Sequence, residues 1–182
     1  VEFPIYPGEL VVIQAPPKSM KTMLIQNWVN YLKKPTYFLE MEMSARQIWQ
    51  RFIQIEKGWT QEEIRHHYAT NIHNGLSDSF KWLYVDYASC MALELEKKVN
   101  MLPIKPEVVV IDHMGLMQSK HKDLNLKMEE IAGALTEVAI RNNVVIFAIC
   151  EITKQAMTEG MNIASVRGSF RIAYNASKIL SL

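Results

Sequence analysis

Lys21 and Thr22 stand at the end of a short loop, between the apolar run LVVI and the helix-like run TMLIQNWVNYL. This placement predicts a phosphate site. In the phosphate-binding loop G-x-x-x-x-G-K-(S/T), backbone N–H groups and a helix N-terminus hold the phosphates, the lysine reaches the β- and γ-oxygens, and the hydroxyl binds magnesium. On this spacing Ala15 and Met20 occupy the two glycine positions. The alternative interpretation is a proline-stiffened turn with a surface lysine.

Three carboxylates could complete such a site. Asp112 ends the apolar run VVVI, and a carboxylate at the tip of a buried strand suits a magnesium ligand behind a phosphate-binding loop. Alternatively, Asp112 caps a turn. Glu40 and Glu42 share one face of an expected strand over residues 36–43. Two carboxylates facing a core would be costly, whereas one near the strand end could polarise an attacking water. Alternatively, both lie on a solvated edge.

These residues need a scaffold, and the sequence predicts one. Apolar, β-branched runs alternate with longer segments of helical period. The runs VVVI and VVIFAI are apolar on both faces, which only a sheet covered by helices on both sides can hide. We therefore expect a three-layer α/β fold with a mainly parallel sheet. The expected strands are residues 10–15, 36–43, 82–87, 107–114, 144–150 and 179–182, and the expected helices are residues 22–32, 44–58, 60–68, 91–102 and 128–143.

Composition limits the class of protein. At 182 residues, with 49% hydrophobic and 21% charged residues, the chain is typical of one globular domain. The formal net charge is +1, so the overall charge of the chain gives no reason to expect binding to nucleic acid. Any such contact must come from a few basic residues on individual loops. Cys90 and Cys150 lie far apart, which suggests reduced thiols and a cytoplasmic location. No apolar run approaches the roughly 20 residues that span a bilayer, so no membrane partner is expected.

Three histidines raise the question of a zinc site. His66, His67 and His73 lie close together in the sequence. No cysteine is nearby, and their spacing departs from the usual ligand patterns. We therefore do not expect them to bind a metal.

Six segments, in this order, form a family resemblance. They are PGELVVIQAPPKSMKT, LEMEMSARQIWQRF, WLYVDYASCMALELEKKV, EVVVIDHMGLM, MEEIAGALTEVAIRNNVVIFAICEITK and SVRGSFRIAYNASKILSL. Together they resemble the RecA-like ATPase, or motor, domain of DnaB-type replicative hexameric helicases, including the phage primase-helicases. Any one segment would be unspecific, but their order extends through nearly the whole chain.

The resemblance implies a RecA-like P-loop NTPase fold and hydrolysis of Mg-ATP coupled to movement along single-stranded DNA. Lys21 would hold the β- and γ-phosphates during catalysis, Thr22 and Asp112 would bind magnesium, and Glu42, at the catalytic-glutamate position, would orient the attacking water. The implied partners are single-stranded DNA, further copies in a homo-hexamer, and a primase or helicase loader. The residues implied in nucleotide binding are Ala15, Pro16, Pro17, Lys18, Ser19, Met20, Lys21, Thr22 and Glu151.

The same resemblance suggests that residues 1–182 are a single RecA-like ATPase domain and a fragment of a longer protein. The chain begins with Val1 instead of methionine and ends on the strand-like run ILSL without a polar tail. An N-terminal domain and the C-terminal end of the family would then be missing. The arginine finger that the family supplies to a neighbouring subunit would lie beyond Leu182, so we expect slow hydrolysis by the isolated domain.

The sequence departs from the family pattern at several positions. Met20 replaces the glycine before the lysine, which is tolerated if its backbone is helical and its side chain points away. Glu151 replaces a glutamine or histidine that senses the γ-phosphate, and a carboxylate there would repel a triphosphate. Ser177 or Lys178 stands where the family has a late aspartate.

Two loops are candidates for contact with DNA. Residues 115–125 include Lys120, His121 and Lys122, and residues 153–169 include Lys154 and Arg167. Lysine and arginine on loops suit sequence-independent binding of DNA phosphates. The alternative is an ordinary solvated charge cluster.

Two other functions stay open at this point. One is a RecA-like recombinase or regulatory ATPase built on the same core. The other is a catalytically impaired paralogue that binds nucleotide or DNA, because the phosphate loop lacks glycine and Glu151 is acidic.

Overall fold

Six parallel strands form the central sheet of the computed structural model, which describes residues 4–70, 76–151, 172 and 175–182. The strand order is β3-β2-β4-β5-β1-β6. Every pairing among these strands is parallel, as the sequence predicted. The strands are β1 (Leu10–Ala15), β2 (Thr36–Glu40), β3 (Leu83–Asp86), β4 (Val108–Asp112), β5 (Val145–Glu151) and β6 (Lys178–Ser181).

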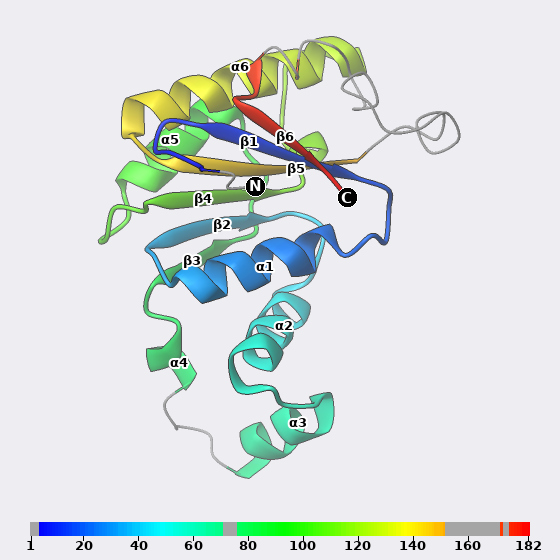
Figure 1. Ribbon diagram of the computed structural model, residues 1–182, viewed down its shortest axis with the longest axis vertical. Coiled ribbons are helices and arrows are strands. Elements are labelled where there is room, and N and C mark those ends of the chain that lie inside the picture. The colour runs from blue at the N-terminus through cyan, green and yellow to red at the C-terminus, as the bar shows by residue number, and fades with distance from the viewer. Residues whose placement is uncertain (1–3, 71–75, 152–171, 173–174) are drawn as a thin grey trace.

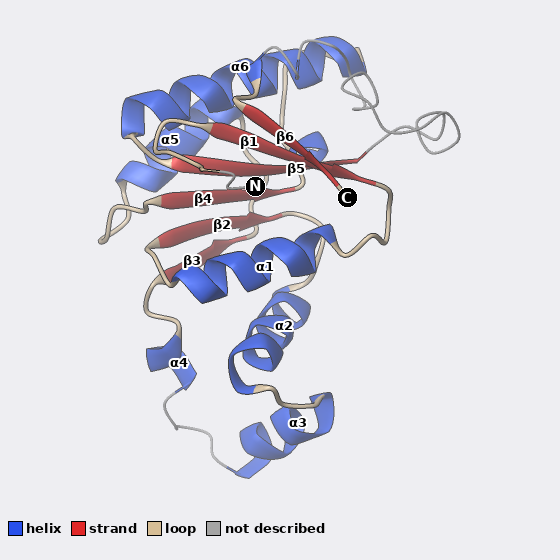
Figure 2. Ribbon diagram, in the orientation of Figure 1, coloured by secondary structure: helices blue, strands red, loops and turns tan. Residues whose placement is uncertain are grey.

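Helices cover both faces of this sheet, so the predicted three-layer arrangement is confirmed (Figures 1 and 2). α5 and α6 lie on one face, and α1 and α2 lie on the other. The helices are α1 (Lys21–Leu32), α2 (Ala45–Lys57), α3 (Gln61–Thr70), α4 (Leu76–Ser79), α5 (Ala92–Asn100) and α6 (Leu124–Asn142), with a 3₁₀ turn η1 (Met114–Leu116). Among the described helices, none is long and apolar enough to cross a membrane.

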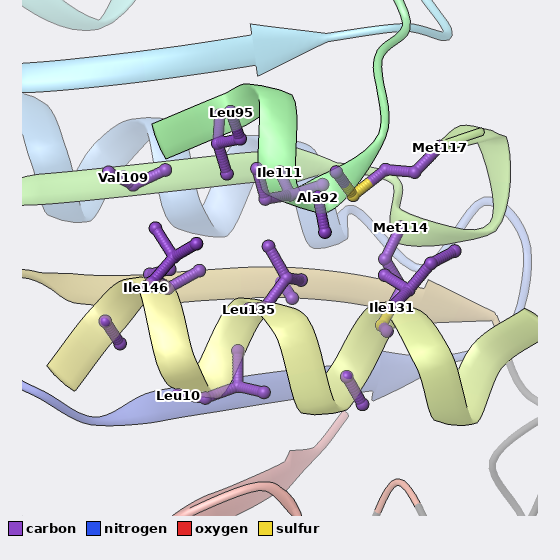
Figure 3. Close-up of a cluster of buried hydrophobic side chains, with 14 of the residues drawn as sticks. Leu10, Ala92, Leu95, Val109, Ile111, Met114, Met117, Ile131, Leu135 and Ile146 are labelled. Carbon is purple, nitrogen blue, oxygen red and sulfur yellow. The ribbon is translucent and has the colours of Figure 1, made fainter. Parts of the chain in front are cut away.

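The central strands are buried on both faces because successive side chains point to opposite sides of the sheet. Val11, Ile13 and Phe38 pack in the cluster that includes α1 and α2 side chains. Their sequence neighbours pack in the other cluster, with α5 and α6. Figure 3 shows this second cluster, to which Leu10, Ile146, Ile131, Leu135, Ala92, Leu95, Val109 and Ile111 contribute.

Local sequence signals place several helix ends. Ser44 accepts the N–H of Gln47 and caps α2, and Gly58, at φ 68°, ends that helix in the left-handed conformation that glycine adopts freely. Thr60 and Glu63 form a capping box, with Thr60 N–H donating to Glu63 Oε2 at 2.7 Å and Glu63 N–H donating to Thr60 Oγ1 at 3.2 Å. The Ser44 cap thus marks where α2 starts after the carboxyl end of β2, and the Gly58 and Thr60 signals separate α2 from α3.

Several predicted boundaries are wrong, among them the end of the strand expected over residues 107–114, which stops at Asp112, and the start of the helix expected at residue 128, which lies at Leu124. The second strand ends at Glu40 and not at residue 43, because the Glu40 side chain accepts the N–H groups of Glu42 and Met43 and the chain turns there. The candidate DNA loop over residues 115–125 is also shorter than expected. η1 occupies its start, and α6 begins at Leu124 after an Asp123 N-cap that accepts Leu126 N–H at 2.9 Å.

Candidate functional site

The loop between β1 and α1 brings Lys21 to the carboxyl edge of the sheet (Figure 1). Residues 16–20 span the gap, and Lys21 is the first residue of α1. The Lys21 ammonium is buried and donates to the carbonyl oxygens of Pro16 at 2.8 Å and Ala15 at 3.4 Å. No side chain among the described residues caps the start of α1. The first-turn N–H groups are therefore available to an anion, which the helix dipole also favours.

Met20 adopts a left-handed backbone, with φ 64° and ψ 22°. This is the glycine-like conformation, and not the right-handed helical one under which we expected methionine to be tolerated. The second condition is met, because the Met20 side chain is 70% exposed and points to solvent. Lys18 is also left-handed, at φ 64°. The loop therefore carries backbone strain at two residues, Lys18 and Met20.

Thr22 and Asp112 meet although 90 residues separate them. Thr22 Oγ1 donates to Asp112 Oδ2 at 2.5 Å. Asp112 ends β4 and is only 1% exposed, and within the described part of the chain its Oδ1 has no hydrogen-bond partner. Burial raises the pKa of Asp112 to about 6, although the Thr22 hydrogen bond opposes this shift. A buried carboxylate oxygen without a donor is a suitable ligand for a divalent cation.

Glu40 and Glu42 lie in different environments, and so do not share one strand face as expected. Glu40 is fully buried at the end of β2, paired in register with Asp112 of β4. Burial and the nearby Asp112 charge raise the pKa of Glu40 to about 7. Glu42 lies in the turn after β2, is exposed, and lines the cavity in front of the phosphate-type loop. Glu42 is therefore the carboxylate that could reach a bound nucleotide.

A cavity of about 500 Å³ joins these elements. Its volume suits a nucleotide triphosphate group, and cations and carboxylates both line it. Pro17, Lys18, Ser19, Met20, Lys21, Thr22, Met23, Glu42, Met43, Arg51 and Glu151 form its walls. Asp112 lies behind Thr22, and Glu151 ends β5 beside Ala15 of β1. The structure thus brings the predicted nucleotide and magnesium residues to one place.

Arg51 is a cavity residue that the sequence prediction missed. It lies on α2, one helical turn after the buried Ile48 and next to the buried Phe52. Burial dominates the raised pKa of Asp112, and the positive charge of Arg51 is among the effects that oppose it. An arginine at the border of the apolar face of an amphipathic helix was the signal that could have found it.

The predicted DNA-contacting residues are only partly described. Lys120 is 71% exposed at its side chain and lies 3.6 Å from Glu130, and Lys122 is exposed. Lys154 and Arg167 lie outside the described residues, as does His73. His66 and His67 lie on α3, and no group of three metal-binding side chains occurs among the described residues.

Comparison with known proteins places this site in a family. The model of the DnaB-like helicase C terminal domain matches residues 5–180. The chain belongs to the DnaB-like helicase C-terminal domain family. A replicative DNA helicase DnaB of Treponema pallidum (strain Nichols) is 26% identical over 96% of the chain and 43% of its own length. The chain thus spans less than half of this curated relative.

Solved structures agree with the DnaB-like fold. A solved ATPase domain superimposes with a TM-score of 0.80, at 18% identity, over 97% of this chain and 70% of that one. A DnaB-like replicative helicase, studied with its interactions with primase, gives 0.78 at 17% identity over 96% and 46%. The RadB recombinase gives 0.60 at 15% identity over 97% and 74%. All three share the RecA-like fold, and the family model favours the helicase branch over the recombinase branch.

Proposed function

We propose that this DnaB-like domain is the ATP-driven motor of a replicative DNA helicase, working on single-stranded DNA in a ring of six copies in the cytoplasm. The proposal treats residues 1–182 as one ATPase domain of a longer protein. The observation behind it is the 2.5 Å contact between Thr22 and Asp112 at the edge of a cavity that Lys21 and Glu42 also reach. Family membership supplies the reaction class.

Each proposed role follows from the position of the side chain. Lys21 exchanges its bonds to loop carbonyl oxygens for the β- and γ-phosphate oxygens. Thr22 and Asp112 offer the hydroxyl and carboxylate oxygens that magnesium prefers, and the Asp112 Oδ1, which has no partner among the described residues, fits that ion. Bound magnesium would neutralise charge on the phosphate oxygens. Glu42 accepts a proton from the attacking water.

Arg51 and Glu151 adjust the charge of the cavity in opposite directions. Both line it, with Arg51 on α2 and Glu151 at the end of β5. The Arg51 guanidinium can hold a phosphate by two parallel hydrogen bonds. The Glu151 carboxylate repels the triphosphate, so we propose that this position couples to the nucleotide differently from the glutamine or histidine of the resembling helicases.

We also propose residues that contact DNA and a class of partner protein. Lys120 and Lys122 lie on the segment between η1 and α6, and we add Lys154 and Arg167 from the resemblance. Loop cations bind DNA phosphates without reading sequence. A DnaB-like relative was studied with primase, so we propose a primase or a helicase loader as a further partner.

Calorimetric binding of Mg-ATP tests the proposal directly. Lys21→Ala should weaken binding at least about tenfold, because a charge-assisted hydrogen bond contributes roughly 1.5–3 kcal/mol. Lys34→Ala is the matched control, since Lys34 pairs with Glu107 before β2, away from the cavity, and should bind normally. If the wild-type protein binds no Mg-ATP, the proposal is wrong, and the catalytically impaired paralogue is favoured.

The same titration tests Arg51. Arg51→Ala should weaken Mg-ATP binding several-fold because it removes one cation from the cavity. Arg46→Ala is the control on the same helix, because Arg46 lines the separate groove between α2 and α3. Equal effects of both substitutions would argue against a direct role for Arg51.

A further inference from the structure

Glu40 is a fully buried carboxylate whose oxygen holds a turn. Its Oε1 accepts two backbone hydrogen bonds, from Glu42 N–H at 2.8 Å and from Met43 N–H at 2.8 Å. Glu40 is 0% exposed and is absent from the walls of the nucleotide cavity. Its side chain therefore acts on the turn and not on the nucleotide.

The turn is fixed on both sides of Glu42. Before it, Met41 N–H donates to the carbonyl oxygen of Asp112 at 2.8 Å, which attaches the turn to the end of β4. After it, Ser44 caps α2 and accepts Gln47 N–H. The two bonds to Glu40 fill the gap between these anchors. These hydrogen bonds, from Met41, Glu42 and Met43 N–H and at the Ser44 cap, fix the backbone around Glu42 and so the direction of its side chain.

Stabilising a turn with a buried carboxylate costs desolvation free energy. Transfer of an acid from water to an apolar interior costs free energy, and an apolar residue of similar size usually stabilises a fold as well or better. Glu40 Oε2 is buried and has no hydrogen-bond partner among the described residues. In its ionised form, Glu40 gains a pair of charge-assisted hydrogen bonds, which are stronger and more directional than neutral ones.

We propose that Glu40 is a positioning residue, which holds the 41–43 turn so that the carboxylate of Glu42 faces the attacking water in the cavity. This inference rests on the proposed function, because that function assigns the water to Glu42. Misplacement of a catalytic group by about 1 Å can cost roughly 100-fold in rate, so the two bonds to Glu40 would matter for turnover more than for binding.

Two substitutions separate positioning from stability. Glu40→Met keeps the volume but removes the acceptor, and Glu40→Gln keeps an amide oxygen that can accept both N–H groups. We expect Glu40→Met to fold normally, to bind Mg-ATP within about threefold of wild type, and to lose about 10- to 100-fold in kcat. Glu40→Gln should recover kcat to within a few-fold. In a Glu42→Gln background, Glu40→Met should add no further loss, because it acts through Glu42.

Amide hydrogen exchange gives a readout that does not need hydrolysis. Exchange at Glu42 and Met43 should accelerate in Glu40→Met and stay close to wild type in Glu40→Gln. The inference would be overturned by any one of four results. In Glu40→Met, amide exchange at Glu42 and Met43 or kcat could stay at the wild-type value. Glu40→Met could also lower kcat in the Glu42→Gln background as much as in wild type, or Glu40→Gln could be as slow as Glu40→Met. Wild-type protein without Mg-ATP hydrolysis would overturn the proposed function, and accelerated exchange would then still show that Glu40 holds the turn.

Discussion

Met20 places a β-carbon in a backbone conformation that glycine adopts without strain. At φ 64° an L-residue with a side chain costs roughly 1–2 kcal/mol relative to the right-handed region. The chain tolerates it because the side chain extends into solvent and meets no steric barrier there. The missing glycine therefore affects the energy of the loop more than its shape, since Lys21 and Thr22 still begin α1 at the carboxyl edge of the sheet.

Met20→Gly should stabilise the fold. Removing the side chain relieves the left-handed strain, and the greater freedom of glycine in the unfolded chain offsets part of the gain, so we expect about 0.5–1 kcal/mol in denaturant unfolding. Met23→Gly is the matched control within α1, where the same change should cost about 1 kcal/mol. A loss of stability in Met20→Gly would contradict the strain account.

Among the elements, the edge strand β3 is held by its parallel pairing with β2 and, in addition, by the side-chain contacts of one carboxylate. Asp86 at the end of β3 accepts the Tyr37 hydroxyl of β2 at 2.6 Å, the Lys98 ammonium of α5 at 2.8 Å and Ala88 N–H at 2.9 Å. Partial burial raises the pKa of Asp86, but the bonds from Lys98, Tyr37 and Ala88 outweigh it and lower the pKa to about 2. The ionised form is therefore stabilised by folding.

This shift predicts how stability depends on pH. Because the folded pKa of Asp86 lies below the ordinary value of 3.8, its contribution is complete above about pH 4 and is lost as the pH falls through about 2. Asp86→Asn should lower the free energy of unfolding by about 1 to 2 kcal/mol at pH 7 and by less at about pH 2.5. Asp78→Asn, in an exposed pair with Lys81, is the control and should change little. Wild-type and Asp86→Asn stability curves that run parallel from neutral to acidic pH would refute this.

At the scale of the whole molecule, the cavity lies where the β1–α1 loop, the turn after β2 and the end of β5 meet at one edge of the sheet. Glu42 is exposed there and Lys21 is buried, and both line the cavity, where we propose that they orient the attacking water and bind phosphate. From the family resemblance we propose that a further arginine comes from an adjacent subunit and from outside residues 1–182. A charge supplied in this way stabilises the transition state only after assembly.

Turnover by residues 1–182 should therefore stay slow at every protein concentration. We expect ATP hydrolysis per chain to change by less than about threefold as larger assemblies appear, because the proposed arginine is not among the residues of this chain. Light scattering after size-exclusion chromatography, run on the same samples as the ATPase assay, measures both quantities. Rapid hydrolysis by a strict monomer would show that the chain needs no arginine from outside.

Much of the fold could be predicted because its signals are local. The predicted strand over residues 10–15 is confirmed as β1, and the apolar runs VVVI and VVIFAI lie in β4 and β5, buried on both faces. Strand ends were harder to predict. The sequence over residues 36–43 predicts one continuous strand, but the strand stops at Glu40, whose side chain accepts the backbone N–H of Glu42. Strand propensity does not show when a side chain competes in this way for backbone hydrogen bonds.

The sequence alone determined the parallel sheet, the helices on both faces, and the chain positions of Lys21, Thr22 and Asp112. Apolar periodicity and strand-end polar residues are properties of short segments, so they can be read without coordinates. Only the tertiary structure decided that Glu40 is buried while Glu42 faces the cavity, that Arg51 reaches it from α2, and that Met20 is left-handed. Those outcomes depend on how distant elements pack and on hydrogen bonds across a turn.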